Sequence, residues 1–204
     1  RPALAMWAAR TTDAAATADD EEPEARVHPA MIPLDHIMAN VNGAYNAIYL
    51  EGDFVGPHLY YGLGAGKRPT GSAVVSDIIS LARQITCGAQ SLVPPLAHVR
   101  TTAETVPIQP IEELVTSYYF RFSAVDRPGV LSKISGILGE HEISIYSVIQ
   151  KGRELDGSVP VVMLTHEARE RSVREALREM DRLDVLTDKT MTIRVEEGKH
   201  HHET

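Results

Sequence analysis

The chain has 204 residues, which is enough for one large domain or two small ones. Its 28 acidic and 20 basic residues give a formal net charge of -8, which argues against nucleic acid or an anionic membrane as a partner, because both attract Lys and Arg. No run approaches the roughly 20 apolar residues that span a bilayer. We therefore expect a soluble protein.

The two ends and the cysteine content suggest a part of a cytoplasmic protein. The single cysteine, Cys87, has no partner within the chain for a disulfide, which fits a reducing compartment. The chain starts at Arg1 with neither a Met nor a signal-peptide pattern, so we expect it to be cut from a longer protein. Residues 198–204 contain three histidines but follow the last apolar strand residue. We interpret them as a disordered tail and expect no metal site.

Residues 1–85 predict a first unit built on a mixed sheet with helices. Short strand-like runs occur at 3–9 and 25–33. Between them, residues 13–24 are rich in Ala, Thr and acids without apolar partners, which indicates a solvated loop.

The rest of this unit predicts two further strands and one helix. Strands are expected at 41–50, rich in Val, Ala, Ile and Tyr, and at 59–61. Residues 72–84 carry apolar side chains at the three-to-four spacing of a helix packed on a sheet. Residues 86–117 are irregular and contain four prolines, so they predict a linker.

The clearest patterns lie in residues 118–197. Apolar side chains alternate where strands are expected and follow helical spacing where helices are expected. The predicted order is a strand at 118–124, a helix at 130–138, strands at 143–150 and 159–163, a helix at 173–180 and a strand at 191–195. The order βαββαβ is typical of a ferredoxin-like sandwich, in which two helices cover one face of a four-stranded antiparallel sheet. The fold class expected for the chain is α+β.

A glycine-rich stretch, residues 62–67, follows a predicted strand and precedes a predicted helix, as a dinucleotide-binding fingerprint does. It lacks the third glycine at the required spacing and the acidic residue about 20 positions later, which disfavours a Rossmann fold. Glycines still allow backbone amides to approach a ligand, and Thr70 and Ser72 are expected to cap the helix start with their hydroxyls. A ligand-facing loop and a plain tight turn are both compatible with this pattern.

A second candidate site is the turn at residues 126–131, which joins the first strand of the sandwich to its first helix. Pro128 sets φ near the value for helix entry, and Gly129 leaves space for a ligand. The backbone amides that follow lie at a helix N-terminus and can bind a carboxylate. From composition alone, a ligand-binding turn and a simple strand-to-helix turn are equally acceptable. The sequence contains no Ser/His/Asp set, paired metal-ligand histidines or Walker-type loop.

Several of these stretches, taken in order, resemble known families. Residues 26–33, 42–48, 61–66 and 69–77 resemble the end of the homoserine dehydrogenase catalytic domain, and 93–96 and 107–113 resemble its connector. Residues 118–197 resemble an ACT domain, the small amino-acid-binding module that many bacterial homoserine dehydrogenases carry at the C-terminus. The resemblance therefore implies part of a catalytic and dimerisation domain at 1–85, a linker at 86–117 and an ACT regulatory domain at 118–197.

In the intact enzyme, the resemblance implies NAD(P)-dependent interconversion of L-homoserine and L-aspartate 4-semialdehyde, a step of threonine and methionine biosynthesis. The residues expected to contact the nicotinamide end of the cofactor are Gly64, Ala65, Gly66 and Thr70. The family's catalytic lysine and acidic substrate ligands would lie upstream of the matched segment. The residues that choose between NAD and NADP would lie there too.

For the ACT domain, the resemblance implies a free amino acid as effector, with threonine as the first candidate, and a homo-oligomer, either a dimer or a tetramer. The residues expected to hold the effector are Asp126, Pro128, Gly129, Val130 and Leu131. One departure leaves the effector's identity open, because the second strand enters through residues 141–145, where ACT domains commonly have Asn. The alternative hypothesis is a non-enzymatic, amino-acid-binding regulatory chain whose first 85 residues serve for oligomerisation.

Overall fold

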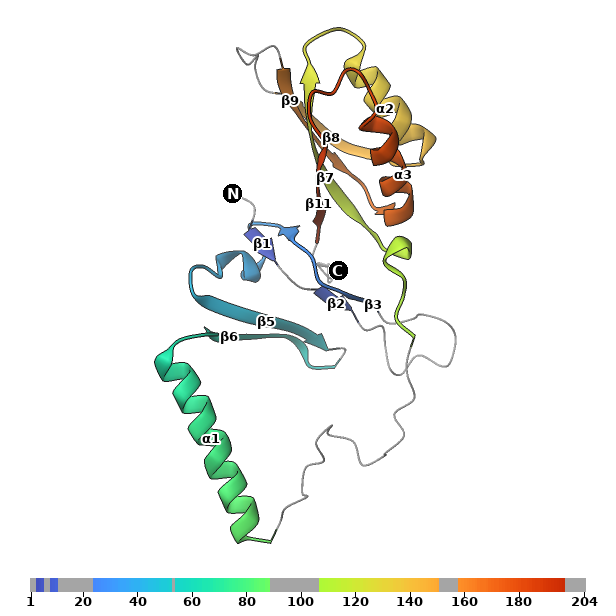
Figure 1. The fold of residues 1–204 in the computed structure, drawn as a ribbon. Coiled ribbons are helices and arrows are strands. Elements are labelled where there is room, and N and C mark those ends of the chain that lie inside the picture. The colour runs from blue at the N-terminus through green and yellow to red at the C-terminus, as the bar shows by residue number, and fades with distance from the viewer. Residues whose placement is uncertain are drawn as a thin grey trace. The chain divides into compact units, whose positions relative to one another are not determined.

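The computed structural model describes residues 3–5, 8–10, 24–52, 54–88, 107–150 and 158–196 (Figure 1). The chain forms two compact units, one made of Arg1–Ala39 with Val106–Thr204 and the other of Asn40–Thr105. In the described part of the chain, no helix is long and apolar enough to cross a membrane.

The first unit contains a four-stranded antiparallel sheet in the order β11-β7-β9-β8. Along the chain, its elements are β7 (Val115–Val125), α2 (Val130–Glu140), β8 (Ile145–Gln150), β9 (Ser158–Thr165), α3 (Glu170–Met180) and β11 (Met191–Val195). A short strand, β10 (Ala168–Arg169), also pairs with β7. Helices α2 and α3 lie together on one face of the sheet (Figure 1). The α+β class and the βαββαβ order predicted from the sequence are confirmed.

Alternation along β7 explains the core of this sandwich. Tyr118, Phe120 and Phe122 point to the helix side and are at most 1% exposed, since successive side chains of a strand face opposite sides. Phe120 and Phe122 pack with ring centroids 5.9 Å apart. Against them lie Ile134 and Leu138 of α2 and, from α3, Val173, Ala176 and Met180. The helical three-to-four spacing brings these side chains onto the faces of α2 and α3 that meet the sheet.

Helix α2 ends in a hydrogen-bonded turn that places a non-glycine residue in the left-handed region. Ile143 N donates to Leu138 O at 2.8 Å, and Glu142 N donates to Gly139 O at 3.1 Å. This is the Schellman arrangement, which favours glycine at the position that Glu142 occupies with φ of 60°. We expect Glu142→Gly to raise the free energy of unfolding by about 0.5–1 kcal/mol, because relief of the left-handed strain outweighs the added entropy of the unfolded chain. Urea denaturation checks this, with Glu140→Gly, inside the helix, as a destabilising control.

Short strands from the start of the chain extend this sheet. β1 (Ala3–Ala5) pairs antiparallel with β4 (Ala30–Ile32), and β4 pairs in parallel with β11. β2 (Ala8–Arg10) and β3 (Glu24–Arg26) form a separate antiparallel pair. The strand predicted at 25–33 is thus divided into β3 and β4. Of the predicted acidic loop, only its last residue, Glu24, lies within the described residues.

The second unit contains a β-hairpin and a long helix. The hairpin consists of β5 (Tyr45–Gly52) and β6 (Gly56–Leu63), and the helix is α1 (Lys67–Thr86). β5 begins later than the sequence predicted because a 3-10 helix, η1 (Ile37–Asn40), and a turn at Gly43 with φ of 67° precede it.

Part of the expected linker is ordered against the sandwich. A 3-10 helix, η2 (Ile111–Glu113), leads into Leu114, which is 3% exposed, and β7 starts at the next residue. The compact units therefore divide the chain differently from the four expected segments, 1–85, 86–117, 118–197 and 198–204. Those boundaries stay a prediction, and the tail lies outside the described residues.

Candidate functional site

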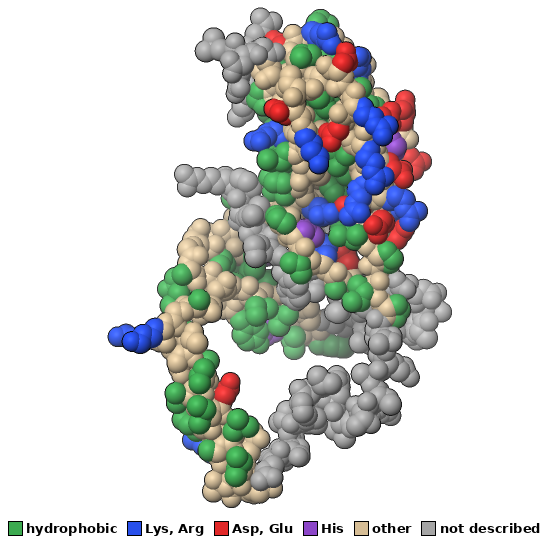
Figure 2. Space-filling view, viewed as in Figure 1, with side chains coloured by type: hydrophobic (Ala, Val, Ile, Leu, Met, Phe, Trp, Pro, Cys, Tyr) green, Lys and Arg blue, Asp and Glu red, His purple; other side chains and the backbone are tan. Residues whose placement is uncertain are grey.

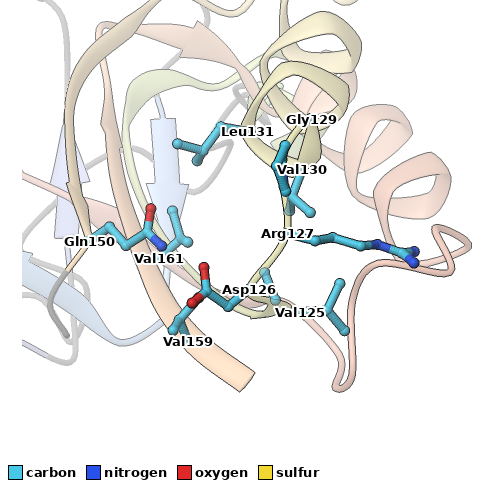
Figure 3. A pocket seen from close by; sticks show the side chains of 11 residues that line it. Val125, Asp126, Arg127, Gly129, Val130, Leu131, Gln150, Val159 and Val161 are labelled. Carbon is cyan, nitrogen blue, oxygen red and sulfur yellow. The ribbon is translucent and has the colours of Figure 1, made fainter. Parts of the chain in front are cut away.

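A pocket of about 330 Å³ lies at the end of the sandwich where β7 leads into α2 (Figure 3). Its lining residues are Ala124, Val125, Asp126, Arg127, Pro128, Gly129, Val130, Leu131, Gln150, Val159 and Val161. All five residues that the sequence proposed for an effector are among them. Their role in binding stays a prediction, but the structure brings them to one cavity of the size of a small molecule.

The wall formed by the turn presents backbone amides. Gly129 is the N-cap of α2 with φ of 89° and ψ of -9°, and no side chain caps the helix. The first amides of a helix have no acceptor within the helix, and the helix dipole adds positive potential at that end. Because the cap residue has no side chain, the amides after Gly129 are suited to an anionic group such as a carboxylate.

Two polar side chains face the cavity from different elements. Figure 3 shows the carboxylate of Asp126 and the amide of Gln150 directed into the same space, with the apolar side chains of Val159 and Val161 beside them. The guanidinium of Arg127 points away and donates to Asp184 Oδ2 at 3.3 Å. An anionic acceptor, a side-chain amide and the amides of a helix N-terminus together suit a ligand that carries ammonium, carboxylate and one further polar group.

Sequence reasoning missed the part of this pocket that comes from β8 and β9. Gln150 is the last residue of β8 and is paired with Val161 of β9 in the sheet. The sequence predicted both strands but gave no register between them, so nothing indicated that Gln150 would face the turn after β7. The available signal was a polar residue directly after the apolar pair Val148 and Ile149 at the end of a predicted strand.

The glycine-rich loop connects β6 to α1 in the second unit. Gly66 is the N-cap of α1 with φ of 132°, a conformation that favours glycine, and Thr70 N donates to Gly66 O at 3.0 Å. The sequence expected the hydroxyls of Thr70 and Ser72 to cap this helix. That expectation was wrong, because the helix begins at Lys67 and no side chain caps it, which places both hydroxyls inside the first two turns.

The strand before this loop belongs to an antiparallel hairpin, unlike the parallel strands of a Rossmann unit. A Cβ at Gly64 would collide with the side-chain amide of Asn46, so glycine at this position keeps the loop close to β5. Ala65 lies between Gly64 and the helix cap and is exposed. The expected cofactor contacts therefore follow each other over the loop and first turn of α1, and their role stays a prediction.

A buried ionic network lies at the other end of β7 from the pocket. Glu170, 4% exposed, accepts from Tyr118 Oη at 2.7 Å and from Arg194 Nε at 2.8 Å. Arg174 Nε also donates to Glu170 at 2.8 Å, and Arg174 Nη1 reaches Glu112 at 3.0 Å. Burial alone would raise the pKa of Glu170, but the donors from Arg194, Tyr118 and Arg174 lower it. Burial also raises the pKa of Tyr118.

The same network fastens the connector to the sandwich. Glu113 of η2 forms ion pairs with Arg171 and, at 3.1 Å, with Arg169. Glu170 N donates to Leu114 O at 2.8 Å. Within the ranges that the structure describes, no group of three or more His, Cys, Asp or Glu is placed to hold a metal ion.

The sandwich is a ferredoxin-like α+β domain with a cavity of small-molecule size, and the chain also forms a second compact unit. Comparison with known families gives two matches: residues 6–79 match the homoserine dehydrogenase family, and residues 118–184 match the ACT domain family. The chain therefore carries a segment that matches homoserine dehydrogenases, followed by a segment that matches ACT domains.

Similar proteins support this assignment across most of the chain. Homoserine dehydrogenase from Pseudomonas aeruginosa is 42% identical over 175 residues, covering 85% of this chain and 40% of that protein. The enzyme from Synechocystis is 40% identical over 184 residues, covering 90% and 42%. The crystal structure of a homoserine dehydrogenase from Thiobacillus denitrificans, 42% identical, superposes with a TM-score of 0.76 over 88% of this chain and 40% of that one. The chain thus spans about 40% of the length of these relatives.

Proposed function

We propose that this chain is the C-terminal part of an NAD(P)-dependent homoserine dehydrogenase whose ACT domain binds an amino acid as a feedback effector. The enzyme would interconvert L-homoserine and L-aspartate 4-semialdehyde in the cytoplasm. The observation that carries the proposal is the order of the two matched segments on one chain, at 42% identity over 85% of its length.

The proposed place of this chain in the reaction is the nicotinamide end of the cofactor site, at Gly64, Ala65, Gly66 and Thr70. The positive φ at Gly66 supports it, because glycines in this conformation commonly allow the backbone to approach a ligand. The chain by itself would neither bind NAD(P)H tightly nor turn over, since hydride transfer requires cofactor and substrate to be held in contact.

An assay of the protein expressed from its full reading frame tests this proposal. We expect reduction of aspartate semialdehyde with NADH or NADPH, and none from the 204-residue chain alone. Gly66→Val should lower kcat/KM at least tenfold, while Gly62→Ala, whose Cβ would meet nothing within 4 Å, should stay within twofold. Turnover by the short chain, or no activity of the full-length protein, would contradict the proposal. The second outcome would favour a non-enzymatic regulatory chain.

For the effector we propose threonine, bound in the pocket between α2 and the ends of β8 and β9. The amides after Gly129 would hold its carboxylate, and Asp126 would accept from its ammonium group. Gln150 offers both a donor and an acceptor to the hydroxyl. Because a buried polar group must be paired, a site built for a hydroxyl should reject valine, which has a methyl group there.

Titration calorimetry on the whole chain measures this preference, with threonine, serine, valine, isoleucine and lysine in turn. We expect threonine to bind and Asp126→Asn to weaken binding at least tenfold, because the ammonium group of the ligand loses its charged acceptor. Asp184→Asn is the matched control, since its side chain is 71% exposed and lies outside the pocket. If no amino acid binds below a few millimolar, roughly 4 kcal/mol of binding free energy, the domain has a structural role.

We also propose that the protein is a homo-oligomer, a dimer or a tetramer. Apolar side chains are exposed along α1, as Figure 2 shows, and on the hairpin. They are Val74, Val75, Ile78, Ile79, Leu81 and Ile85 on α1, and Tyr45, Ile48, Leu50, Tyr60, Tyr61 and Leu63 on β5 and β6. Exposed apolar patches of this extent mark protein interfaces. Light scattering that finds a monomer at tens of micromolar would contradict self-association of this chain.

A further inference from the structure

The ACT sheet and the homoserine dehydrogenase segment share a strand pairing. β4 lies within the segment that matches homoserine dehydrogenase, and it adds in parallel to β11, with Ala30 opposite Arg194 and Met31 opposite Val195. Glu196 N donates to Met31 O at 2.8 Å. Ala30 is 2% exposed, so this pairing is a packed part of the unit.

A side-chain contact reinforces the pairing. Arg26 Nη2 donates to Glu196 Oε1 at 2.6 Å, with side chains 9% and 27% exposed. An ion pair shielded from water in this way is stronger than one on an open surface. Backbone and side chain of Glu196 therefore both hold the segment 24–32 against the end of β11.

One strand leads from this joint to the pocket. β7 contributes Ala124 and Val125 to the pocket at its C-terminal end. At its N-terminal end, Ser117 is paired with Val195, and Thr116 Oγ1 donates to Val195 O at 2.9 Å. β7 lies in the interior of the sheet between β11 and β9, so a shift of the strand at one end is resisted along its whole length.

We infer that the β4–β11 joint couples the ACT sheet to the homoserine dehydrogenase segment, so that the order of residues 24–32 depends on the order of the sandwich. The joint makes the two family segments one cooperative unit at this point, although they are separate in sequence. Through the same joint, binding of a ligand in the pocket would change the order of β4 by way of β7. Only this effect of the ligand rests on the proposed function.

Hydrogen exchange on the whole chain, read by mass spectrometry, tests the joint. Glu196→Pro removes the amide that donates to Met31 while keeping an extended backbone. We expect exchange in residues 24–32 to speed up at least tenfold, with amides of α2 and α3 within twofold of the unsubstituted chain. Glu196→Gln keeps the amide and loses the ion pair, so its effect should be smaller. Unchanged exchange at 24–32 in Glu196→Pro would overturn the inference.

A second measurement does not depend on the proline variant. Phe120→Ala destabilises the sandwich at β7, which β11 separates from β4, and should speed exchange at 24–32 as much as at β11. If exchange in residues 24–32 keeps its original rate while exchange in β11 becomes faster, the joint does not couple the two segments. Added threonine should slow exchange at both places. If threonine slows exchange at the pocket but not at 24–32, transmission through β7 is contradicted. If threonine changes exchange nowhere, the proposed effector is contradicted, and the Glu196→Pro and Phe120→Ala variants still decide whether the joint couples the two segments.

Discussion

Glu170→Gln is expected to lower the free energy of unfolding of the sandwich by about 3 kcal/mol, because it leaves two arginines without their buried carboxylate. Glu170 is 4% exposed and accepts from Arg194 and Arg174, whereas glutamine keeps the shape but not the charge. Urea denaturation followed by circular dichroism measures the loss. The matched control is Glu175→Gln on the same helix, whose side chain is 52% exposed near His141 and should change stability by less than about 1 kcal/mol.

The same substitution should alter the dependence of stability on pH. The pKa of Glu170 is lowered in the folded chain from its ordinary value of 4.5, because its hydrogen bonds outweigh burial. A carboxyl of this kind stabilises the fold above its unfolded pKa, and that stabilisation disappears as the pH falls through the folded pKa. Stability of the unsubstituted chain should therefore fall more steeply below about pH 4.5 than that of Glu170→Gln. If the two curves of stability against pH are parallel, the carboxyl of Glu170 is not the source of the acid-dependent loss of stability.

Phe120→Ala should destabilise the sandwich by about 3–5 kcal/mol, the range for removing a buried aromatic ring. Phe120 is fully buried at the centre of β7 and packs between Tyr118 and Phe122, with centroids 6.1 and 5.9 Å away. The sheet and helices around it cannot close the space without leaving their packing. Thermal and urea unfolding measure the effect.

Two variants calibrate this loss. Phe120→Leu fills part of the space and should cost less than half as much as Phe120→Ala. Ile149→Ala changes an apolar side chain of β8 that is 46% exposed, and its cost should be below about 1 kcal/mol. A similar loss for Phe120→Ala and Ile149→Ala would mean that the centre of the sheet is not tightly packed.

Local periodicity made the sandwich predictable, and its absence explains the errors elsewhere. Alternation along 118–124 and helical spacing at 130–138 are strong because each element buries one face. The hairpin in the second unit exposes most of its side chains on both strands, so no alternation marked its ends. Helix α1 was predicted to begin at residue 72, yet it starts directly after Gly66. The prediction missed this start because a glycine cap carries no side-chain signal.

The candidate site was predictable only where it is local in sequence. The turn at 126–131 could be read from its proline and glycine, and the structure places it at the pocket. Gln150 and Val161 reach the same pocket through strand register, which depends on packing across the sheet. Glu170 meets Tyr118 and Arg194, which are 52 and 24 residues away in the sequence. The sequence showed Glu170 as one more acid ahead of an amphipathic helix.

The pairing of β4 with β11 has a consequence for any attempt to isolate the ACT domain. A strand with an uncovered side presents unpaired amides and carbonyls that recruit strands from other molecules. A chain shortened to start at residue 107 would leave β11 in this condition along the side that β4 covers. Such a fragment should associate reversibly with concentration through β11, even though its helices and core remain intact. Including residues 24–32 as a separate peptide should cap the strand and restore the monomeric sandwich.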